Sequence, residues 1–255
     1  MYKRQGVGAN LQDHYVARVS HRVRHAKSIN SLSRGTNLLK EIATWAFSGK
    51  GALTFGVTSA MVFSRSREGL SSPDLQLLFT PASYSERTLG KLEQEDGMTV
   101  AVCPVRPASR GTIMAVSSDP FVRPEIRPNY LSDPDDVRVL LAGIHQTREI
   151  FSQPALQRYS SKETAPGTQI QTFEELENFA RENGSIIYHP VSTCRMGDDA
   201  MAVVDPRLRV HGIKGLRVVD ASIMPTVTTG NTNAPTIMIA EKASDMILED
   251  ERQAS

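Results

Sequence analysis

The chain has 255 residues, of which 40% are hydrophobic and 22% are charged. This composition is typical of a globular protein with one large domain or two smaller ones. Lysine and arginine (29) nearly balance aspartate and glutamate (28), giving a formal net charge of +1. A nearly neutral chain gives no electrostatic reason to expect nucleic acid or an anionic membrane as a partner.

The sequence predicts neither a membrane span nor a secretion signal. Its apolar stretches are shorter than the run that a transmembrane helix needs. Residues 1–5 are not followed by the apolar segment of a signal peptide, so we predict a cytoplasmic protein. One disulfide between Cys103 and Cys194 is feasible, but we expect both cysteines to stay reduced.

The first part of the chain predicts two strands and a helix between them. Alternating apolar residues predict a strand over residues 14–23. Apolar residues at helical spacing predict a helix over residues 30–47, which Gly49 and Gly51 end. A short buried strand is expected over residues 74–80, between two prolines.

The middle of the chain predicts a hairpin followed by a helix. Residues 98–105 and 111–117 both have the composition of strands, and their short, turn-rich connection predicts an antiparallel hairpin. A helix is expected from about Ser132 to Ser152. It has Pro134 and two acidic residues in its first turn, where both suit the positive end of a helix.

The last part of the chain predicts two helices and one strand. Thr172 and Glu175 form a capping box, which predicts a helix that ends near Asn183. A short buried strand is expected over residues 216–220, and a helix is expected to open at residues 233–235. These elements predict an α/β (α+β) fold, with a mixed or antiparallel sheet covered by helices and a terminal strand and helix.

Short polar motifs are concentrated in the last quarter of the chain and recur near its beginning and middle. They are GVGANLQDH at 6–14, PASRG at 107–111, PNYL at 128–131, YHPVSTCRMG at 188–197, VVDP at 203–206, VVDAS at 218–222 and GNTNAPT at 230–236. In this order, they resemble the C-terminal part of the glucose–methanol–choline (GMC) oxidoreductases. Within that family, the choline dehydrogenase-like alcohol dehydrogenases are the most similar, and PNYL matches the family's strand before a long helix.

The chain differs from this family in its length, because family members are roughly twice as long. Their N-terminal half carries the Gly-x-Gly-x-x-Gly fingerprint that cradles a pyrophosphate. Here Leu11 stands at the third glycine position after Gly6 and Gly8, and the pair at 49 and 51 is followed by threonine at 54. We therefore interpret the chain as a fragment that lacks the dinucleotide-binding half.

The resemblance implies a division of the chain into three parts, with a boundary near residue 180. Residues 1–13 would be a residual loop of the FAD-binding domain, and residues 14–180 a substrate-binding domain. Residues 181–255 would be the catalytic segment together with the terminal strand and helix of the incomplete FAD-binding domain.

The resemblance further implies that FAD oxidises a primary alcohol, choline-like or other, to an aldehyde. The hydride goes to flavin N5, and a base that titrates near neutral pH takes the hydroxyl proton. His189 matches the family's catalytic histidine, and Pro190 restricts its backbone to extended conformations. The alternative interpretation of His189 is a core histidine that is hydrogen-bonded to the main chain.

Residues near the final helix are expected to complete the site. Asn231 corresponds to a family position that holds histidine or asparagine beside the catalytic histidine, where it would hydrogen-bond the substrate oxygen. The residues expected at the cofactor are Asp220, Ala221, Asn231, Thr232 and Asn233. The alternative roles are helix capping for the two asparagines and strand termination for the aspartate.

Other classes of site fit the sequence less well. His189 and Cys194 lack the further ligands of a metal cluster, so no metal site is predicted. The chain has no Gly-x-Ser-x-Gly elbow, no His-Glu-x-x-His motif and no P-loop. The expected partners are therefore a small alcohol substrate, an electron acceptor and the missing half of the enzyme. The competing hypothesis is a non-catalytic fragment that cannot bind FAD.

Overall fold

The computed structural model describes residues 6–85 and 90–254 and divides the chain into two compact units. Unit 1 consists of residues 1–15, 105–136 and 186–255, and unit 2 of residues 16–104 and 137–185. Each unit is therefore assembled from segments that lie far apart in the sequence. The assignment of residues 14–180 and 181–255 to substrate-binding and catalytic domains stays a prediction.

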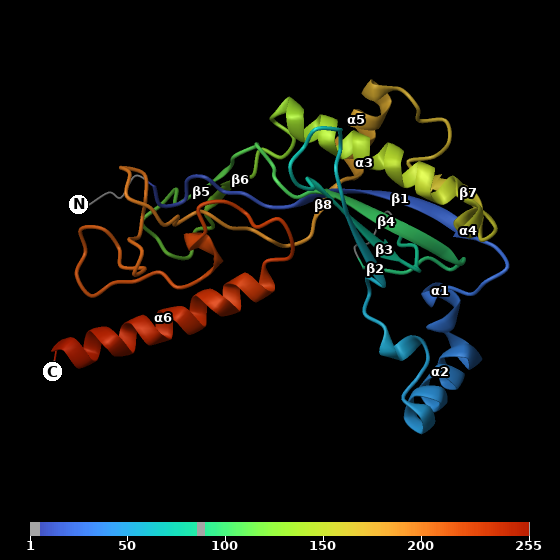
Figure 1. The fold of residues 1–255 in the computed structure, drawn as a ribbon, viewed down its shortest axis with the longest axis horizontal. Helices are drawn as coiled ribbons and strands as arrows, with labels where there is room; N and C mark the ends of the chain where they lie inside the picture. The colour runs from blue at the N-terminus through green and yellow to red at the C-terminus, as the bar shows by residue number, and fades with distance from the viewer. Residues whose placement is uncertain (1–5, 86–89, 255) are drawn as a thin grey trace. The chain divides into compact units, whose positions relative to one another are not determined.

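Unit 2 is built on a sheet with the strand order β2-β3-β4-β1-β7, in which β8 also pairs with β1 (Figure 1). Neighbouring strands along this order are antiparallel. The bounds are β1 Tyr15–Val23, β2 Ala60–Ser64, β3 Leu75–Thr80, β4 Gly97–Pro104, β7 Ser160–Ala165 and β8 Ser185–Ile186. The structure confirms the strands predicted at residues 14–23, 74–80 and 98–105.

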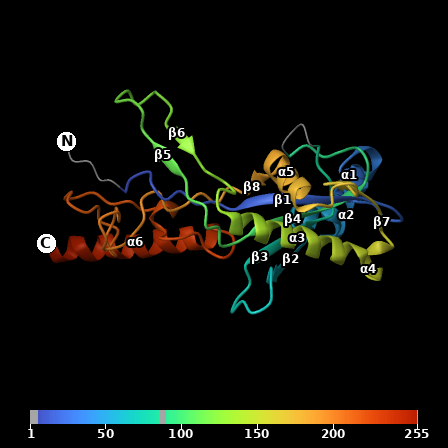
Figure 2. The same cartoon turned by 90° about the horizontal axis from the view of Figure 1, so that it is seen from above.

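A long helix packs closely on this sheet. Helix α3 (Pro134–Ser152) runs alongside the strands in both views (Figure 1 and Figure 2). A Cβ atom added to Gly143 would lie 2.4 Å from Val102 Cγ1 and 2.9 Å from Leu75 Cδ2. The missing side chain of this glycine therefore lets helix and sheet approach each other. β3 and β4 are buried at nearly every position, as expected for central strands.

The remaining helices of unit 2 are α1 (Ile29–Leu32), α2 (Gly35–Ser48), η1 (Ala52–Thr54), α4 (Pro154–Gln157) and α5 (Phe173–Asn183). The helix predicted over residues 30–47 is split in two, because Gly35 has a φ of +52°, which a right-handed helix cannot continue. Gly49 ends α2 in the left-handed conformation, with a φ of +63°. The predicted capping box of α5 is confirmed, with Thr172 and Glu175 bonding reciprocally.

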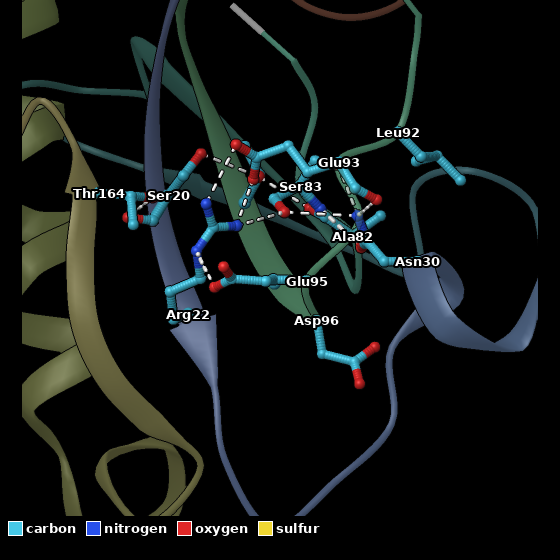
Figure 3. A network of polar contacts seen from close by, with 12 residues as sticks. Ser20, Arg22, Asn30, Ala82, Ser83, Leu92, Glu93, Glu95, Asp96 and Thr164 are labelled. Atoms are coloured by element: carbon cyan, nitrogen blue, oxygen red, sulfur yellow. Dashed lines mark hydrogen bonds and ion pairs between the residues drawn. The ribbon is translucent and has the colours of Figure 1, made fainter.

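Helix α1 is held in unit 2 by a network of buried polar contacts (Figure 3). The Asn30 amide donates to the main-chain oxygens of Ser83 and Glu93, at 2.8 and 3.1 Å. Its oxygen accepts a hydrogen bond of 3.0 Å from the Ser83 N–H. Beside it, Arg22 of β1 pairs with the carboxylates of Glu93 and Glu95. Side chains thus add hydrogen bonds to main-chain groups of the 83–93 segment.

The predicted hairpin between residues 98–105 and 111–117 is wrong. β4 pairs with β1 and β3, whereas β5 (Thr112–Met114) pairs with β6 (Glu125–Arg127) in a separate two-stranded sheet of unit 1. The connection does not fold back, because the Asp136 carboxylate accepts hydrogen bonds from the N–H groups of Ala108 and Ser109, at 2.7 and 2.9 Å.

Two further strand predictions are also wrong, although the final helix is confirmed. Residues 216–220 form only an isolated bridge, Arg209 with Arg217, and Asp220 caps the short 3-10 helix η2 (Ala221–Ile223). The run lacks a neighbouring strand and instead packs Val218 and Val219 against the core. The motif at 128–131 is a turn, and β6 ends just before it.

The core of unit 1 forms around helix α6 (Asn233–Ala254). Ile239 and Ala243 of this helix are buried with apolar residues of the preceding loops, namely Val191, Val203, Val204, Leu208, Val210, Ile223, Met224 and Val227. Near the end of α6, Asp250 pairs with both Arg207 and Arg217. Among the described residues, no helix has the length and apolar character to cross a membrane.

Candidate active site

His189 lies where two extended segments of unit 1 run antiparallel. Main-chain hydrogen bonds join Gln12 to Val191 in both directions, at 3.2 and 2.9 Å. A third joins the Ile187 N–H to the His14 carbonyl, at 3.3 Å. This pairing brings the sequence around residues 12–14 beside the catalytic motif, although 175 residues separate His14 from His189.

The Asp13 carboxylate fixes the backbone on both sides of this pairing. Its Oδ1 accepts hydrogen bonds from the N–H groups of His14 and His189, at 2.7 and 2.8 Å. Its Oδ2 accepts a bond of 3.3 Å from the Tyr130 hydroxyl. Burial raises the pKa of Asp13, although these hydrogen bonds and the neighbouring His189 act in the opposite direction. Burial, followed by the charge of Asp13, raises the pKa of Tyr130.

The two imidazole rings are in direct contact. His14 Nδ1 lies 2.9 Å from His189 Nδ1, and the ring planes meet at 82°. The other nitrogen of His14, Nε2, lies 3.3 Å from the Val105 carbonyl oxygen. The other nitrogen of His189, Nε2, lies 3.4 Å from the Asn231 side-chain nitrogen. The predicted pair of His189 and Asn231 is therefore brought together, and the interpretation of His189 as bonded only to the main chain is incomplete.

Burial disfavours the charged form of both histidines. His14 is completely buried and His189 is 8% exposed. Burial, followed by the charge of His189, lowers the pKa of His14 to about 4. Burial also lowers the pKa of His189, with Asp13 acting to raise it. Burial thus favours the uncharged imidazole of His189, the form that can accept a proton.

The loop before α6 presents the predicted amide residues. Asn231 and Asn233 are exposed, whereas Thr232 between them is 8% exposed. The Thr232 carbonyl accepts bonds from both the N–H and the hydroxyl of Thr236, at 3.0 and 2.7 Å. Because α6 begins at Asn233, the position before the helix belongs to Thr232 and not to an asparagine. The alternative of a capping role for the two asparagines stays a prediction.

Asp220 and Ala221 lie in a separate turn of unit 1. The exposed Asp220 carboxylate accepts a bond of 2.7 Å from the Ser222 N–H, and the Ser222 carbonyl accepts the Cys194 N–H at 2.9 Å. Burial raises the pKa of the Cys194 thiol, and Asp220 adds to this. These bonds connect Asp220 to Ser222 and, through it, to Cys194. The contact of Asp220 and Ala221 with a cofactor stays a prediction.

Sequence reasoning missed three consecutive residues that build the site. Besides Asp13 and His14, Gln12 is buried, and its side chain bonds the Pro225 oxygen at 3.4 Å and the Val227 N–H at 3.2 Å. It thus holds the loop that leads to Asn231. The signal was a run of three polar residues directly before a strand with alternating buried positions, a place where burial forces each polar group to find a partner.

The sequence matches a known enzyme family and longer curated relatives. A model of the GMC oxidoreductase family matches residues 107–240. The oxygen-dependent choline dehydrogenase of Serratia proteamaculans is 42% identical over 242 residues, which cover 95% of this chain and 43% of the relative. The enzyme of the same name from Chromohalobacter salexigens is 41% identical, with the same coverage. The chain thus spans less than half the length of these curated relatives.

Solved structures share the fold. A formate oxidase variant from Aspergillus oryzae RIB40, studied for FAD modification, matches with a TM-score of 0.88 at 23% identity, over 99% of this chain and 49% of that one. Pyridoxine 4-oxidase from Mesorbium loti matches with a TM-score of 0.78 at 25% identity, over 96% and 44%. These likenesses confirm the predicted mixed fold with antiparallel sheets and helices.

Proposed function

Because the chain belongs to the GMC oxidoreductase family, we propose that it supplies the substrate side of an active site that oxidises a primary alcohol to an aldehyde. FAD would be the oxidant. The observation that carries this proposal is the pairing of His189 Nε2 with the Asn231 amide at 3.4 Å, beside a buried carboxylate. The names of the curated relatives favour a choline-like alcohol.

The residues of unit 1 fit the ring end of a flavin. The first N–H groups of a helix are not bonded within it and carry partial positive charge. Helix α6 is 22 residues long, and its first residues, Asn233 and Ala234, are exposed. This donor set, with Asn231 and Thr232 before it, suits the negative charge of a reduced flavin ring. Asp220 and Ala221 would reach the ribityl region, whereas the sequence has no Gly-x-Gly-x-x-Gly cradle for the pyrophosphate.

His189 would act as the base. An alcohol oxygen within hydrogen-bond reach of both His189 Nε2 and Asn231 Nδ2 would give its proton to the imidazole and accept a bond from the amide. The amide orients the oxygen but does not take the proton, because amides do not titrate at neutral pH. FAD, when bound, would supply the acceptor for the hydride that leaves the carbinol carbon.

Asp13 would stabilise the site after this proton transfer. The imidazolium of His189 forms close to the buried Asp13 carboxylate, which already acts to raise the pKa of His189. The carboxylate is held by two main-chain N–H groups and Tyr130, so it does not need to move. Fixed charges aimed at the place where charge develops are the most effective form of electrostatic catalysis.

The competing function is a non-catalytic fragment, favoured by the absence of the glycine fingerprint from these 255 residues. Flavin binding separates the two. If the purified chain shows no flavin absorbance and gains none when FAD is added, the catalytic proposal fails for this chain alone, and the test moves to the chain joined to a dinucleotide-binding half.

Turnover of a primary alcohol then tests the role of His189. In the flavin-loaded protein, His189→Ala should lower kcat by a factor on the order of 10² or more. His145→Ala is the matched control, because His145 is an exposed histidine of α3 in unit 2. Near-normal turnover of His189→Ala, with flavin still bound, would remove His189 from the role of base.

A further inference from the structure

The base must present an unprotonated nitrogen to the substrate, and a neutral imidazole carries its proton on either Nδ1 or Nε2. The contacts of the buried His14 ring decide which nitrogen of His189 is free. The starting point is the Val105 carbonyl oxygen, 3.3 Å from His14 Nε2. A carbonyl can only accept a hydrogen bond, so His14 must carry its proton on Nε2.

The remaining nitrogen of His14 is then an acceptor. His14 is fully buried, and burial lowers its pKa to about 4, so the ring holds a single proton at neutral pH. With that proton on Nε2, only a lone pair remains on Nδ1. The 2.9 Å contact between the two Nδ1 atoms needs one donor, and His189 must supply it. A neutral His189 therefore carries its lone pair on Nε2.

We propose that His14 is a positioning residue that holds His189 in the tautomer with its proton on Nδ1 and its lone pair on Nε2, facing Asn231. The contact of His189 with Asn231 is consistent with this tautomer, because the Asn231 side-chain nitrogen is a donor and lies 3.4 Å from the Nε2 lone pair. All donors then point the same way, from Asn231 through His189 and His14 to the Val105 carbonyl. The inference rests on the proposed function only for its catalytic consequence.

The opposite arrangement is disfavoured at the buried end. If His14 donated from Nδ1, its Nε2 lone pair would face the lone pairs of the Val105 oxygen. Two acceptors would then face each other in a place without solvent exposure, which leaves buried polar groups unsatisfied. The Val105 carbonyl acts to raise the pKa of His14, which is the effect of an acceptor on a ring N–H, and the Thr228 main chain acts in the same direction.

The arrangement also suits the protonated base. When Nε2 of His189 takes the substrate proton, its Nδ1–H bond to His14 is unchanged, and no group has to rotate. Two further titratable groups lie beside the pair. The Asp13 carboxylate accepts hydrogen bonds from the main-chain N–H groups of His14 and His189, and the Tyr130 hydroxyl donates to Asp13. The His14 imidazole orients His189 as a carboxylate orients the catalytic histidine of hydrolase triads. In those triads, the wrong histidine tautomer lowers turnover greatly.

Nitrogen-15 NMR of histidine-labelled protein reads the tautomer directly and without turnover. At neutral pH, we expect His189 to show a protonated Nδ1 and an unprotonated Nε2, and His14 to show the reverse. In His14→Phe, His189 loses its acceptor and should shift towards the Nε2–H form that free imidazole favours. In His14→Asn, a side-chain oxygen near the position of Nδ1 can replace the acceptor, and the wild-type tautomer of His189 should return.

The outcomes separate this inference from the proposed function. A wild-type His189 protonated on Nε2 overturns the inference, whether or not His189 is the base, and needs no variant that might misfold. In the flavin-loaded protein, His14→Phe should lower kcat/KM on the order of tenfold or more, and His14→Asn should restore most of it. Equal turnover in wild type and His14→Phe, when His189→Ala does lose turnover, also overturns the inference. Loss of activity in neither His189→Ala nor His14→Phe, with the expected tautomer present, refutes only the proposed function.

Discussion

The two units of this chain obtain their order in different ways. Unit 2 is organised by strands of five to nine residues, β1 to β4 and β7, whose pairing is antiparallel throughout. The described part of unit 1 holds one sheet of two three-residue strands, together with isolated bridges. Its segments are joined largely by side chains, such as Gln12 and Asp13, that bond the main chain of distant residues.

This difference explains why the candidate site lies in unit 1. A regular sheet pairs its own main-chain groups, so the strands of unit 2 do not depend on buried polar side chains to be joined. Irregular segments need such side chains, so unit 1 keeps a carboxylate and two imidazoles buried together. The cost is that each contact depends on one residue and not on a repeated pattern. Substitutions in the two units should therefore differ in their effects, beginning with the largest.

Two glycines with nearly the same positive φ allow the cost of backbone strain to be separated from the cost of a close contact. Gly8 of unit 1 has a φ of +81°, and an added Cβ would lie 1.9 Å from the Ile113 main-chain oxygen. Gly69 of unit 2 has a φ of +80° and nothing within 4 Å. Gly69→Ala should cost about 1 kcal/mol from the left-handed backbone alone. Gly8→Ala should cost about 4 kcal/mol, because a main-chain oxygen must also move.

Urea unfolding of both variants measures this difference. An equal loss of unfolding free energy in the two would show that unit 1 is as tolerant as unit 2 at this backbone conformation. It would then contradict the idea that irregular segments of unit 1 are held by single close contacts.

Acid should weaken unit 1 before unit 2. The pKa of His14 falls from 6.5 to about 4 on folding, so the unfolded chain binds more protons between these values, and stability declines as the pH falls through them. The full displacement corresponds to roughly 3 kcal/mol. In unit 2, burial acts to raise the pKa of Glu163, but the hydrogen bonds from Arg148, together with His21 at 3.7 Å, keep it below its ordinary 4.5. That contribution is lost only below pH 4.5.

Hydrogen exchange at pH 7, 6 and 5 follows both units in one sample. Amides of unit 1 should lose protection first, and His14→Asn should flatten this dependence because asparagine does not titrate. Simultaneous loss in both units, or an unchanged slope in His14→Asn, would assign the acid sensitivity to other groups.

The smallest effects should come from the surface of unit 2. Thr172→Ala removes the cap of α5 and should cost about 1 kcal/mol. Glu177→Ala removes an exposed pair with Arg181 on the same helix and should cost less than about 0.5 kcal/mol. Thermal unfolding of the two variants compares them. A larger loss for Glu177→Ala would reverse the order expected from capping.

Periodicity in the sequence was a good guide to elements but not to their partners. Helices α3, α5 and α6 were predictable, because their start signals and apolar spacing are local. The pairing of β4 with β1 and β3 was not, since register depends on residues far away in the chain. β2 was missed because its residues are almost all exposed at the sheet edge and lack a buried pattern.

The candidate site shows the same limit. His189 and Asn231 were found through their motifs, and the structure brings them together as expected. The neighbouring Asp13 and His14 lie in a motif that was noticed, but their roles require the pairing of residues 12 and 191, which no local pattern reveals. The strand expected at 216–220 failed because a short apolar run packs equally well as an irregular segment of a core.

The rate at which an alcohol reduces the bound flavin without oxygen, followed across pH, tests the central claim most directly. If His189 is the base, the rate should rise with pH to a plateau, with an apparent pKa below 6.5, because burial lowers the pKa of His189. In His189→Ala, the plateau should fall on the order of 100-fold and this pH dependence should vanish. An unchanged profile in His189→Ala would contradict the account.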